Sequence, residues 1–322
     1  MTEQVIIQRH LDSGVTLPGE GTLRVAVEIR MPAPSALRPI ALVCLPGGGM
    51  NRHYFDLSAK DGKADAMSFS FARQMTARGF IVVMMDYLAI GGSDRPADGY
   101  ALTPEVLVQA SAHVLDQVLA ELRAQQPALK TIGVGHSMGA MMTVLQQAKY
   151  HQHQAVALLG FSTRGLPEYL IQEARELAVS DRAAARDCMV GLARKTFFEP
   201  YPVIKPSAQA STLYAGSRAD PRAASIIRPA STHLLPVPAF MSMLPGNVAP
   251  EAAQIDVPVF LGLGELDIAG PPQDIPAAFP ASPEVSLHIW PATGHSHFLF
   301  PARSELFEQI AEWAEKVTAS RV

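Results

Sequence analysis

The chain has 322 residues, of which 48% are hydrophobic and 17% charged, and its formal net charge is −4 at pH 7. A chain this long and this apolar can bury a large core without disulfides or metal ions. The slightly acidic balance and the lack of a basic stripe argue against nucleic acid as a partner. Two cysteines, Cys44 and Cys188, do not make a disulfide framework, which favours a reducing compartment.

The sequence argues against a targeting signal and against a membrane span. The opening residues, Met1 to Val5, include an acidic side chain and no long apolar run, unlike a secretory signal. No stretch approaches the ~18 consecutive apolar residues of a membrane helix. We therefore expect a cytoplasmic protein without a membrane partner. The sequence leaves open whether it forms a homodimer.

Strand and helix patterns alternate along the first half of the chain. Short apolar or β-branched runs are typical of strands. Several of these runs are wholly apolar, which indicates strands that are buried on both faces of the sheet. One helix pattern has Thr103 at its N-cap and Pro104 at its first position. The predicted strands are residues 4–10, 21–31, 40–45, 80–85, 130–135 and 155–160, and the predicted helices are residues 68–78, 138–150 and the segment from Pro104 to Leu122. This order predicts a mostly parallel sheet with helices on both faces.

The alternation stops after residue 161. Residues 162–256 show no clear strand, and their two helical segments, near residues 167–180 and 182–197, are followed by a proline-rich stretch. A long insertion between two strands usually lies over the strand ends, where it can act as a lid.

The sheet pattern resumes in the last part of the chain. Two further strands and a closing amphipathic helix are predicted for residues 257–263, 285–289 and 303–317. The fold class is therefore α/β, with a mostly parallel eight-stranded sheet. We predict a core domain of residues 1–161 and 257–322, with a mainly helical cap, residues 162–256, inserted between strands 6 and 7.

One serine stands between two glycines, as Gly135-His136-Ser137-Met138-Gly139, between a predicted strand and a predicted helix. Side chains two residues on either side of a serine in so tight a turn would collide, so both positions need glycine. The turn leaves the hydroxyl exposed at the N-terminus of the helix, where free N–H groups stabilise negative charge.

Reactive side chains follow the ends of three predicted strands. Ser137 follows the strand that ends near residue 135, Asp267 follows the strand that ends at Leu263, and His295 follows the strand that ends at Ile289. Ligands bind outside the carboxyl ends of parallel strands, so the three side chains are expected to converge there.

This convergence, in the chain order Ser, Asp, His, resembles the α/β-hydrolase superfamily. The motifs that carry the resemblance are the glycine-flanked Ser137, Gly264-Glu265-Leu266-Asp267 and Gly294-His295, and the match covers nearly the whole chain except the insertion. The segment from Asp86 to Ser93 also resembles the loop after that family's fourth strand. Pro46 departs from the pattern, because many members carry histidine there.

The expected mechanism gives each residue a role. Ser137 needs a base to become a nucleophile, and we expect His295 to be that base, oriented by Asp267. The backbone N–H groups of Met138 and Gly48 are expected to bind the oxyanion, with Gly49 as a close rival of Gly48. No metal ion or organic cofactor is expected.

Each assignment has an alternative. His297 could be the base instead of His295, and Glu265 could replace Asp267; otherwise His297 is a loop residue near the mouth of the site. A metal site at His295-x-His297 is disfavoured, because no further cluster of ligands lies nearby. Asp86 is expected to hold a turn through backbone hydrogen bonds.

Several further residues are candidate substrate contacts. These are Gly49, His53, His136 and Met241, although His136 also fits a packing role and His153 fits a solvated face. Met241 belongs to a strongly apolar segment, residues 234–244, which either lines the site or packs the cap onto the sheet.

A serine at the turn favours acyl chemistry, because the dehalogenases and epoxide hydrolases of the superfamily carry aspartate there. We expect hydrolysis of a small or medium hydrophobic carboxylic ester or lactone. The alternatives are a thioesterase, an acyltransferase, a C–C bond hydrolase and a non-catalytic ligand receptor. The apolar segment has no cluster of Arg or Lys that would bind the phosphates of coenzyme A, which weakens the thioesterase alternative. The intact set of Ser137, Asp267 and His295 disfavours a non-catalytic receptor, which needs a pocket but no base.

Overall fold

The computed structural model describes residues 5–203 and 218–319. Gln4, the first residue of the first predicted strand, lies outside the described residues. So do residues 204–217 of the predicted cap, which include one proline of the proline-rich stretch, Pro206.

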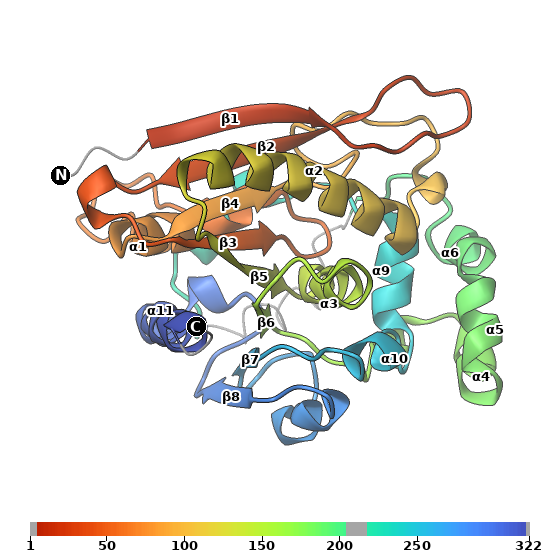
Figure 1. The fold of residues 1–322 in the computed structure, drawn as a ribbon. Coiled ribbons are helices and arrows are strands. Elements are labelled where there is room, and N and C mark those ends of the chain that lie inside the picture. Colours follow the sequence, from red (N-terminus) through yellow and green to blue (C-terminus); the bar gives the residue numbers. More distant parts are fainter. Residues whose placement is uncertain (1–4, 204–217, 320–322) are drawn as a thin grey trace.

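Eight strands of the described residues form one sheet in the order β1-β2-β4-β3-β5-β6-β7-β8 (Figure 1). The strands are β1 (Val5–Asp12), β2 (Arg24–Met31), β3 (Ile40–Leu45), β4 (Ile81–Met85), β5 (Lys130–His136), β6 (Ala155–Leu159), β7 (Val259–Gly264) and β8 (Val285–Trp290). β2 pairs antiparallel with β1 and β4, and every other pairing is parallel. The predicted fold class is confirmed, with strand ends within a few residues of those expected.

Helices cover both faces of the sheet, and each face has its own hydrophobic cluster. The helices of the core are α1 (Phe71–Ala77), α2 (Pro104–Gln125), α3 (Met138–Tyr150) and α11 (Arg303–Ala319). α2 and α3 pack on one face, and α1 and α11 pack on the other. The Thr103 hydroxyl accepts a hydrogen bond from the N–H of Val106 at 3.4 Å, which confirms the predicted N-cap.

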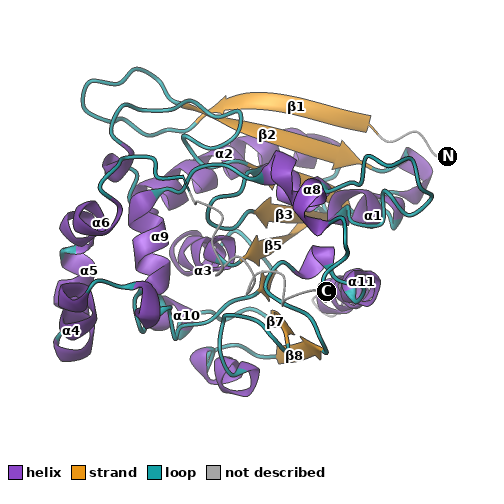
Figure 2. Ribbon diagram, turned by 180° about the vertical axis from the view of Figure 1, so that it is seen from behind, coloured by secondary structure: helices purple, strands orange, loops and turns teal. Residues whose placement is uncertain are grey.

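Between β6 and β7 the described residues form helices and no named strand. These helices are α4 (Gln172–Ser180), α5 (Arg182–Asp187), α6 (Met189–Phe197), α8 (Ala223–Ile227), α9 (Pro236–Met243) and α10 (Ala249–Ala252). The helix expected over residues 182–197 is broken at Cys188 into α5 and α6. α4, α5, α6 and α9 lie beyond the carboxyl ends of β3 and β5 (Figures 1 and 2).

The described residues of the insertion share their buried apolar clusters with the rest of the chain. Apolar side chains of α6 and α9 belong to the same buried cluster as α2 and α3, and those of α8 belong to the cluster of α1 and α11. The predicted domain boundaries stay a prediction, but the cap packs continuously onto the sheet.

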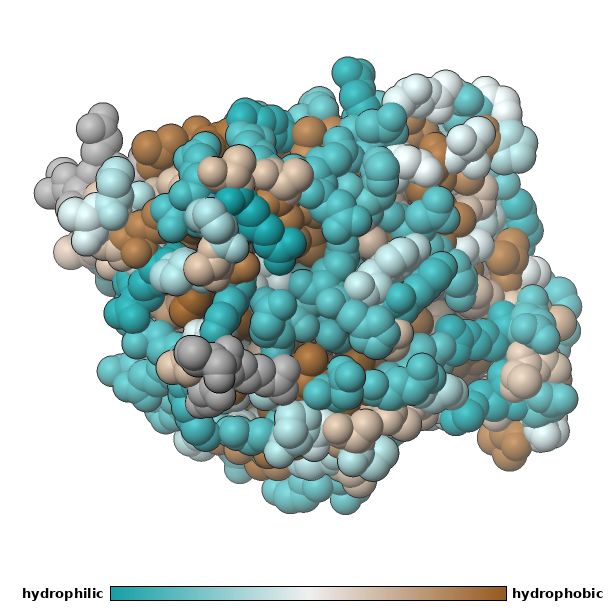
Figure 3. Space-filling model, in the orientation of Figure 1, coloured by the Kyte–Doolittle hydropathy of each residue, from teal (hydrophilic) through white to brown (hydrophobic). Residues whose placement is uncertain are grey.

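The surface is predominantly hydrophilic on the face drawn in Figure 3, with apolar residues scattered among polar ones. Within residues 5–203 and 218–319, no helix combines the length and the apolarity that crossing a membrane requires.

His153 is buried, which corrects its expected place on a solvated face. The side chain of Gln147 makes two hydrogen bonds to the backbone of His153. Its Oε1 accepts from the N–H at 2.9 Å, and its Nε2 donates to the carbonyl at 3.0 Å. Burial lowers the pKa of His153 to about 4.

This low pKa makes stability depend on pH. An unfolded histidine titrates near pH 6.5, so between pH 6.5 and 4 the unfolded chain binds a proton that the folded chain does not. We expect the free energy of unfolding to fall as the pH drops through this window, by about 3 kcal/mol from His153 alone. Urea unfolding at pH 4.5 and 7 should show a smaller pH difference for His153→Gln than for the wild type. Equal differences would contradict this assignment.

Candidate active site

Ser137 stands at a strained turn between β5 and α3. Its φ angle is 56°, in the left-handed region that non-glycine residues rarely adopt. A Cβ atom on Gly135 would lie 2.4 Å from the carbonyl oxygen of Gly139, and a Cβ atom on Gly139 would lie 2.1 Å from that of Leu45. Both glycines are therefore required for the turn, as the sequence pattern predicts.

The structure brings Ser137, His295 and Asp267 into one hydrogen-bonded chain. His295 Nε2 lies 2.7 Å from Ser137 Oγ, and His295 Nδ1 lies 2.7 Å from Asp267 Oδ1. Because a carboxylate only accepts, the proton is on Nδ1 in the neutral ring. Nε2 is then free to accept the proton of the Ser137 hydroxyl.

His297 contacts the same carboxylate. Its Nε2 lies 2.8 Å from Asp267 Oδ2, and its side chain is 1% exposed. The sequence-based alternatives, a rival base or a loop residue at the mouth, are both corrected by this geometry. His297 is buried behind Asp267, and it is His295 whose ring contacts Ser137.

Asp267 is held as a carboxylate at the centre of this arrangement. Its side chain is fully buried, and burial by itself disfavours the charged form. The neighbouring His295 and His297 more than offset this and hold the pKa of the Asp267 carboxyl well below its ordinary range.

Glu265, the alternative partner of the base, has a different role. It is exposed, and its Oε2 accepts from the N–H of Ala292 at 2.8 Å. Ala292 has a φ of 53°, so Glu265 stabilises a strained turn in the loop that leads to His295.

Gly160 makes room for both histidines at the end of β6. Its φ is +63°, and a Cβ atom there would lie 2.8 Å from His295 Cε1 and 3.3 Å from His297 Cε1. Gly191 offers a matched control, since it lies in α6 and nothing approaches its Cβ position within 4 Å.

We expect Gly160→Ala to lower kcat about 10- to 100-fold for the ester hydrolysis that the sequence leads us to expect, because the added methyl group displaces the ring of His295. Gly191→Ala should leave kcat unchanged. Steady-state kinetics on the two purified variants checks this. Equal rates in both would contradict the close packing of Gly160 against the histidines.

The glycine loop after β3 lies against the turn that holds Ser137. A Cβ atom on Gly47 would be 3.3 Å from Ser137 Cβ, and one on Gly48 would be 3.6 Å from Met138 Sδ. The N–H of Met138 is the first of α3 and has no acceptor within the helix. No acceptor is seen for the N–H of Gly48 in the described part of the chain.

Two of the expected substrate contacts, His136 and Met241, are fully buried and pack against other side chains. His136 is fully buried, stacks on Tyr54 at 4.4 Å between ring centroids, and donates from Nε2 to the carbonyl of His295 at 2.8 Å. Burial and the two neighbouring histidines hold the pKa of His136 well below its ordinary value. Met241 is fully buried in α9 and packs the cap onto the core.

In the apolar segment, residues 234–244, it is Leu234 and not Met241 whose side chain lies nearest to the Cβ position of Gly48. Leu234 Cδ2 lies 3.4 Å from the Cβ position of Gly48. His53 is half-buried in the 3-10 helix Arg52–Asp56, and its role as a substrate contact stays a prediction, as does that of Gly49.

Asp86 has the structural role predicted for it. Its carboxylate accepts from the N–H of Arg52 at 2.7 Å and from the N–H of Gly92 at 3.0 Å, and it pairs with the Arg52 guanidinium. It ties the loop after β4 to the 3-10 helix that follows the glycine loop. Among the described residues, no set of three His, Cys, Asp or Glu side chains is arranged to hold a metal ion.

Comparison with known proteins decides the family. A model of the alpha/beta hydrolase family matches residues 42–305, most of the chain. The chain belongs to the α/β-hydrolase family. No curated protein matches it in sequence.

Solved structures of other proteins share the fold of this α/β-hydrolase at low sequence identity. An esterase from Thermogutta terrifontis has a TM-score of 0.57 and 18% identity, and the match covers 96% of this chain and 99% of that one. A lipase in its open form has a TM-score of 0.66 and 14% identity, with coverages of 98% and 99%. A proline iminopeptidase from Mycobacterium smegmatis has a TM-score of 0.58 and 17% identity, with coverages of 98% and 100%. At such identities these likenesses show the fold alone.

Proposed function

We propose that this α/β-hydrolase is a serine hydrolase that cleaves a carboxylic ester or lactone of a small to medium hydrophobic substrate through an acyl-enzyme on Ser137. Family membership supports hydrolase activity in general. The observation that carries the finer proposal is the 2.7 Å contact between Ser137 Oγ and a histidine whose other nitrogen is bound to a buried carboxylate.

The first half of the reaction forms the acyl-enzyme. His295 Nε2 takes the proton of Ser137 as Oγ attacks the carbonyl carbon, and Asp267 stabilises the imidazolium that results. The tetrahedral intermediate then collapses, its bond to the alcohol oxygen breaks, and His295 returns the proton to that oxygen. Water, activated by the same histidine, hydrolyses the acyl-enzyme and restores Ser137.

The oxyanion of the tetrahedral intermediate needs preorganised donors, each of which lowers the barrier by about 3–4 kcal/mol in enzymes of this kind. The N–H groups of Met138 and Gly48 are proposed for this role. They suit it because Met138 opens α3 directly after Ser137 and the Gly48 backbone lies beside it.

An apolar substrate is favoured by what surrounds these donors. Leu234 and Met138 are the side chains nearest to the Gly48 Cβ position, and both are apolar. Thioester cleavage, acyl transfer and C–C bond hydrolysis on the same residues remain the alternatives. A non-catalytic receptor is disfavoured, because a ligand pocket has no use for the hydrogen bond between Ser137 and His295.

A panel of p-nitrophenyl esters from acetate to palmitate, together with a series of lactones, tests the proposal. We expect turnover with an optimum at short or medium acyl chains. A folded protein that hydrolyses none of these esters or lactones would contradict the assignment.

A further inference from the structure

A segment of the cap pairs with the glycine loop as a short strand pairs with its neighbour. The N–H of Asn51 donates to the carbonyl of Ala230 at 2.8 Å, and the N–H of Thr232 donates to the carbonyl of Gly49 at 2.8 Å. Between these bonds, Met50 and Ser231 form an antiparallel bridge. The loop that carries Gly48 is therefore hydrogen-bonded to the cap directly after Gly48.

The side chain of Asn51 adds a second connection. Its Nδ2 donates to the carbonyl of Pro229 at 3.2 Å, and its Oδ1 accepts from the N–H of His53 at 2.9 Å. Asn51 is only 8% exposed. One amide thus connects the cap segment with the start of the 3-10 helix Arg52–Asp56.

Leu234, three residues after Ser231, makes a third contact between the cap segment and the glycine loop. Its side chain reaches the Gly48 backbone, 3.4 Å from the Cβ position. Its own N–H donates to the carbonyl of Pro202 at 2.8 Å, which fixes this part of the segment within the cap.

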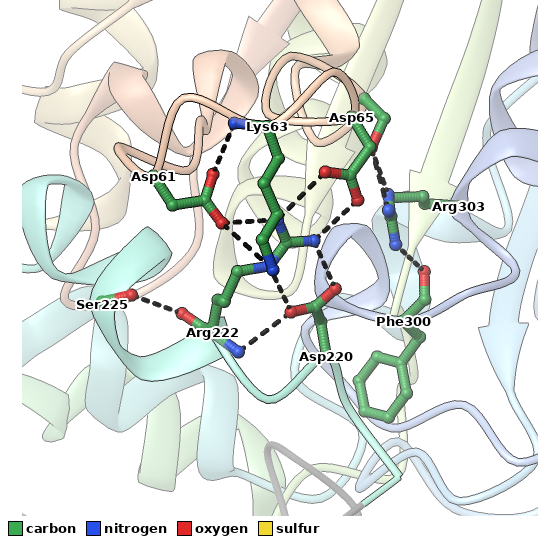
Figure 4. A network of polar contacts seen from close by, with 9 residues as sticks. Asp61, Lys63, Asp65, Asp220, Arg222, Ser225, Phe300 and Arg303 are labelled. Carbon is green, nitrogen blue, oxygen red and sulfur yellow. Dashed lines mark hydrogen bonds and ion pairs between the residues drawn. The ribbon is translucent and has the colours of Figure 1, made fainter.

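The stretch of chain just before this cap segment, residues 220–227, is anchored to the core. The guanidinium of Arg222 contacts Asp220 at 2.9 Å, Asp61 at 3.0 Å and Asp65 at 2.7 Å (Figure 4). Asp61 and Asp65 belong to the core, so the arginine joins the two parts of the chain. Directly after it, α8 buries Ala223, Ile226 and Ile227 in the cluster of α1 and α11.

A glycine-rich loop needs such support. Three successive glycines, Gly47 to Gly49, have more backbone freedom than other residues, and Gly49 adopts a φ of +72°. A donor stabilises an oxyanion effectively only if it is already in place when the charge develops.

We infer that the cap segment Pro229–Leu234 holds the glycine loop in its working position, with Asn51 as the positioning residue that links the two. The inference rests on the proposed function, in which the Gly48 N–H binds the oxyanion. It gives the cap a part in the chemical step, beyond covering the site.

Two variants of Asn51 separate its connections. Asn51→Ser keeps a side-chain oxygen that can accept from the N–H of His53 as an N-cap, but it cannot reach Pro229. Asn51→Ala removes both connections. Thermal denaturation of each variant reports any loss of folded protein, and the serine variant carries the test should the alanine variant not fold.

We expect both variants to lower kcat about 10- to 100-fold, with KM within about twofold of the wild type, because the donor is needed in the transition state and not for binding. A trifluoromethyl ketone, which forms a tetrahedral adduct on the serine, should lose affinity by the same factor as kcat/KM. The matching methyl ketone, which binds as a ground-state analogue, should keep its affinity.

The outcomes distinguish this inference from the proposed function. Wild-type kcat in Asn51→Ser, or a loss confined to KM, would overturn the positioning role while ester hydrolysis by Ser137 stands. Ester hydrolysis that does not depend on Ser137 would overturn the proposed function itself.

Discussion

Ser137→Ala is expected to lower kcat for ester hydrolysis by about 10⁴- to 10⁶-fold. The variant keeps His295 and Asp267 but has no oxygen to attack the substrate, and members of such a chain act as a unit. The turn itself should survive, because alanine is no larger than serine and both flanking glycines remain. Steady-state kinetics with a p-nitrophenyl ester measures the loss.

Ser180→Ala is the matched control, since Ser180 is an exposed serine at the end of α4. Its kcat should equal that of the wild type. If Ser137→Ala and Ser180→Ala hydrolyse the ester equally fast, Ser137 is not the nucleophile.

His295→Ala is expected to have an effect of similar size, about 10⁴- to 10⁶-fold in kcat. Without the imidazole, nothing accepts the proton of the Ser137 hydroxyl at 2.7 Å. His297 cannot substitute for it, because its contact is with the far oxygen of Asp267. The rates of both histidine variants, measured with one ester, check this ranking.

His297 variants provide the comparison. His297→Gln can keep a neutral N–H donor to Asp267 and should retain most of the activity, whereas His297→Leu should lose about 10- to 100-fold. In the leucine variant Asp267 Oδ2 loses its hydrogen bond from His297, so the carboxylate that orients the ring of His295 is held less firmly. A larger loss in His297→Leu than in His295→Ala would mean that the base is His297.

The sheet and the three residues at its edge could be predicted because their signals are local. Buried strands can be recognised in the sequence as apolar runs. The glycines on either side of Ser137 are needed because larger side chains would collide there, as the structure confirms. The chain order of Ser137, Asp267 and His295 follows from where three strands end.

The parts that the sequence missed depend on contacts between distant segments. The buried position of His297 on Asp267 results from the way the loop after β8 folds into the 3-10 helix His297–Leu299, which has no periodic signal. The bridge between Met50 and Ser231 is too short for a strand pattern. His153 is buried by long-range packing, although its neighbours in sequence are polar.

The most direct test of the central claim is mass spectrometry of the protein quenched in acid during turnover of a slowly hydrolysed ester. The account predicts one acyl group on the peptide that contains Ser137, absent from Ser137→Ala. Turnover with no adduct on that peptide, or with the acyl group on another residue, would contradict it.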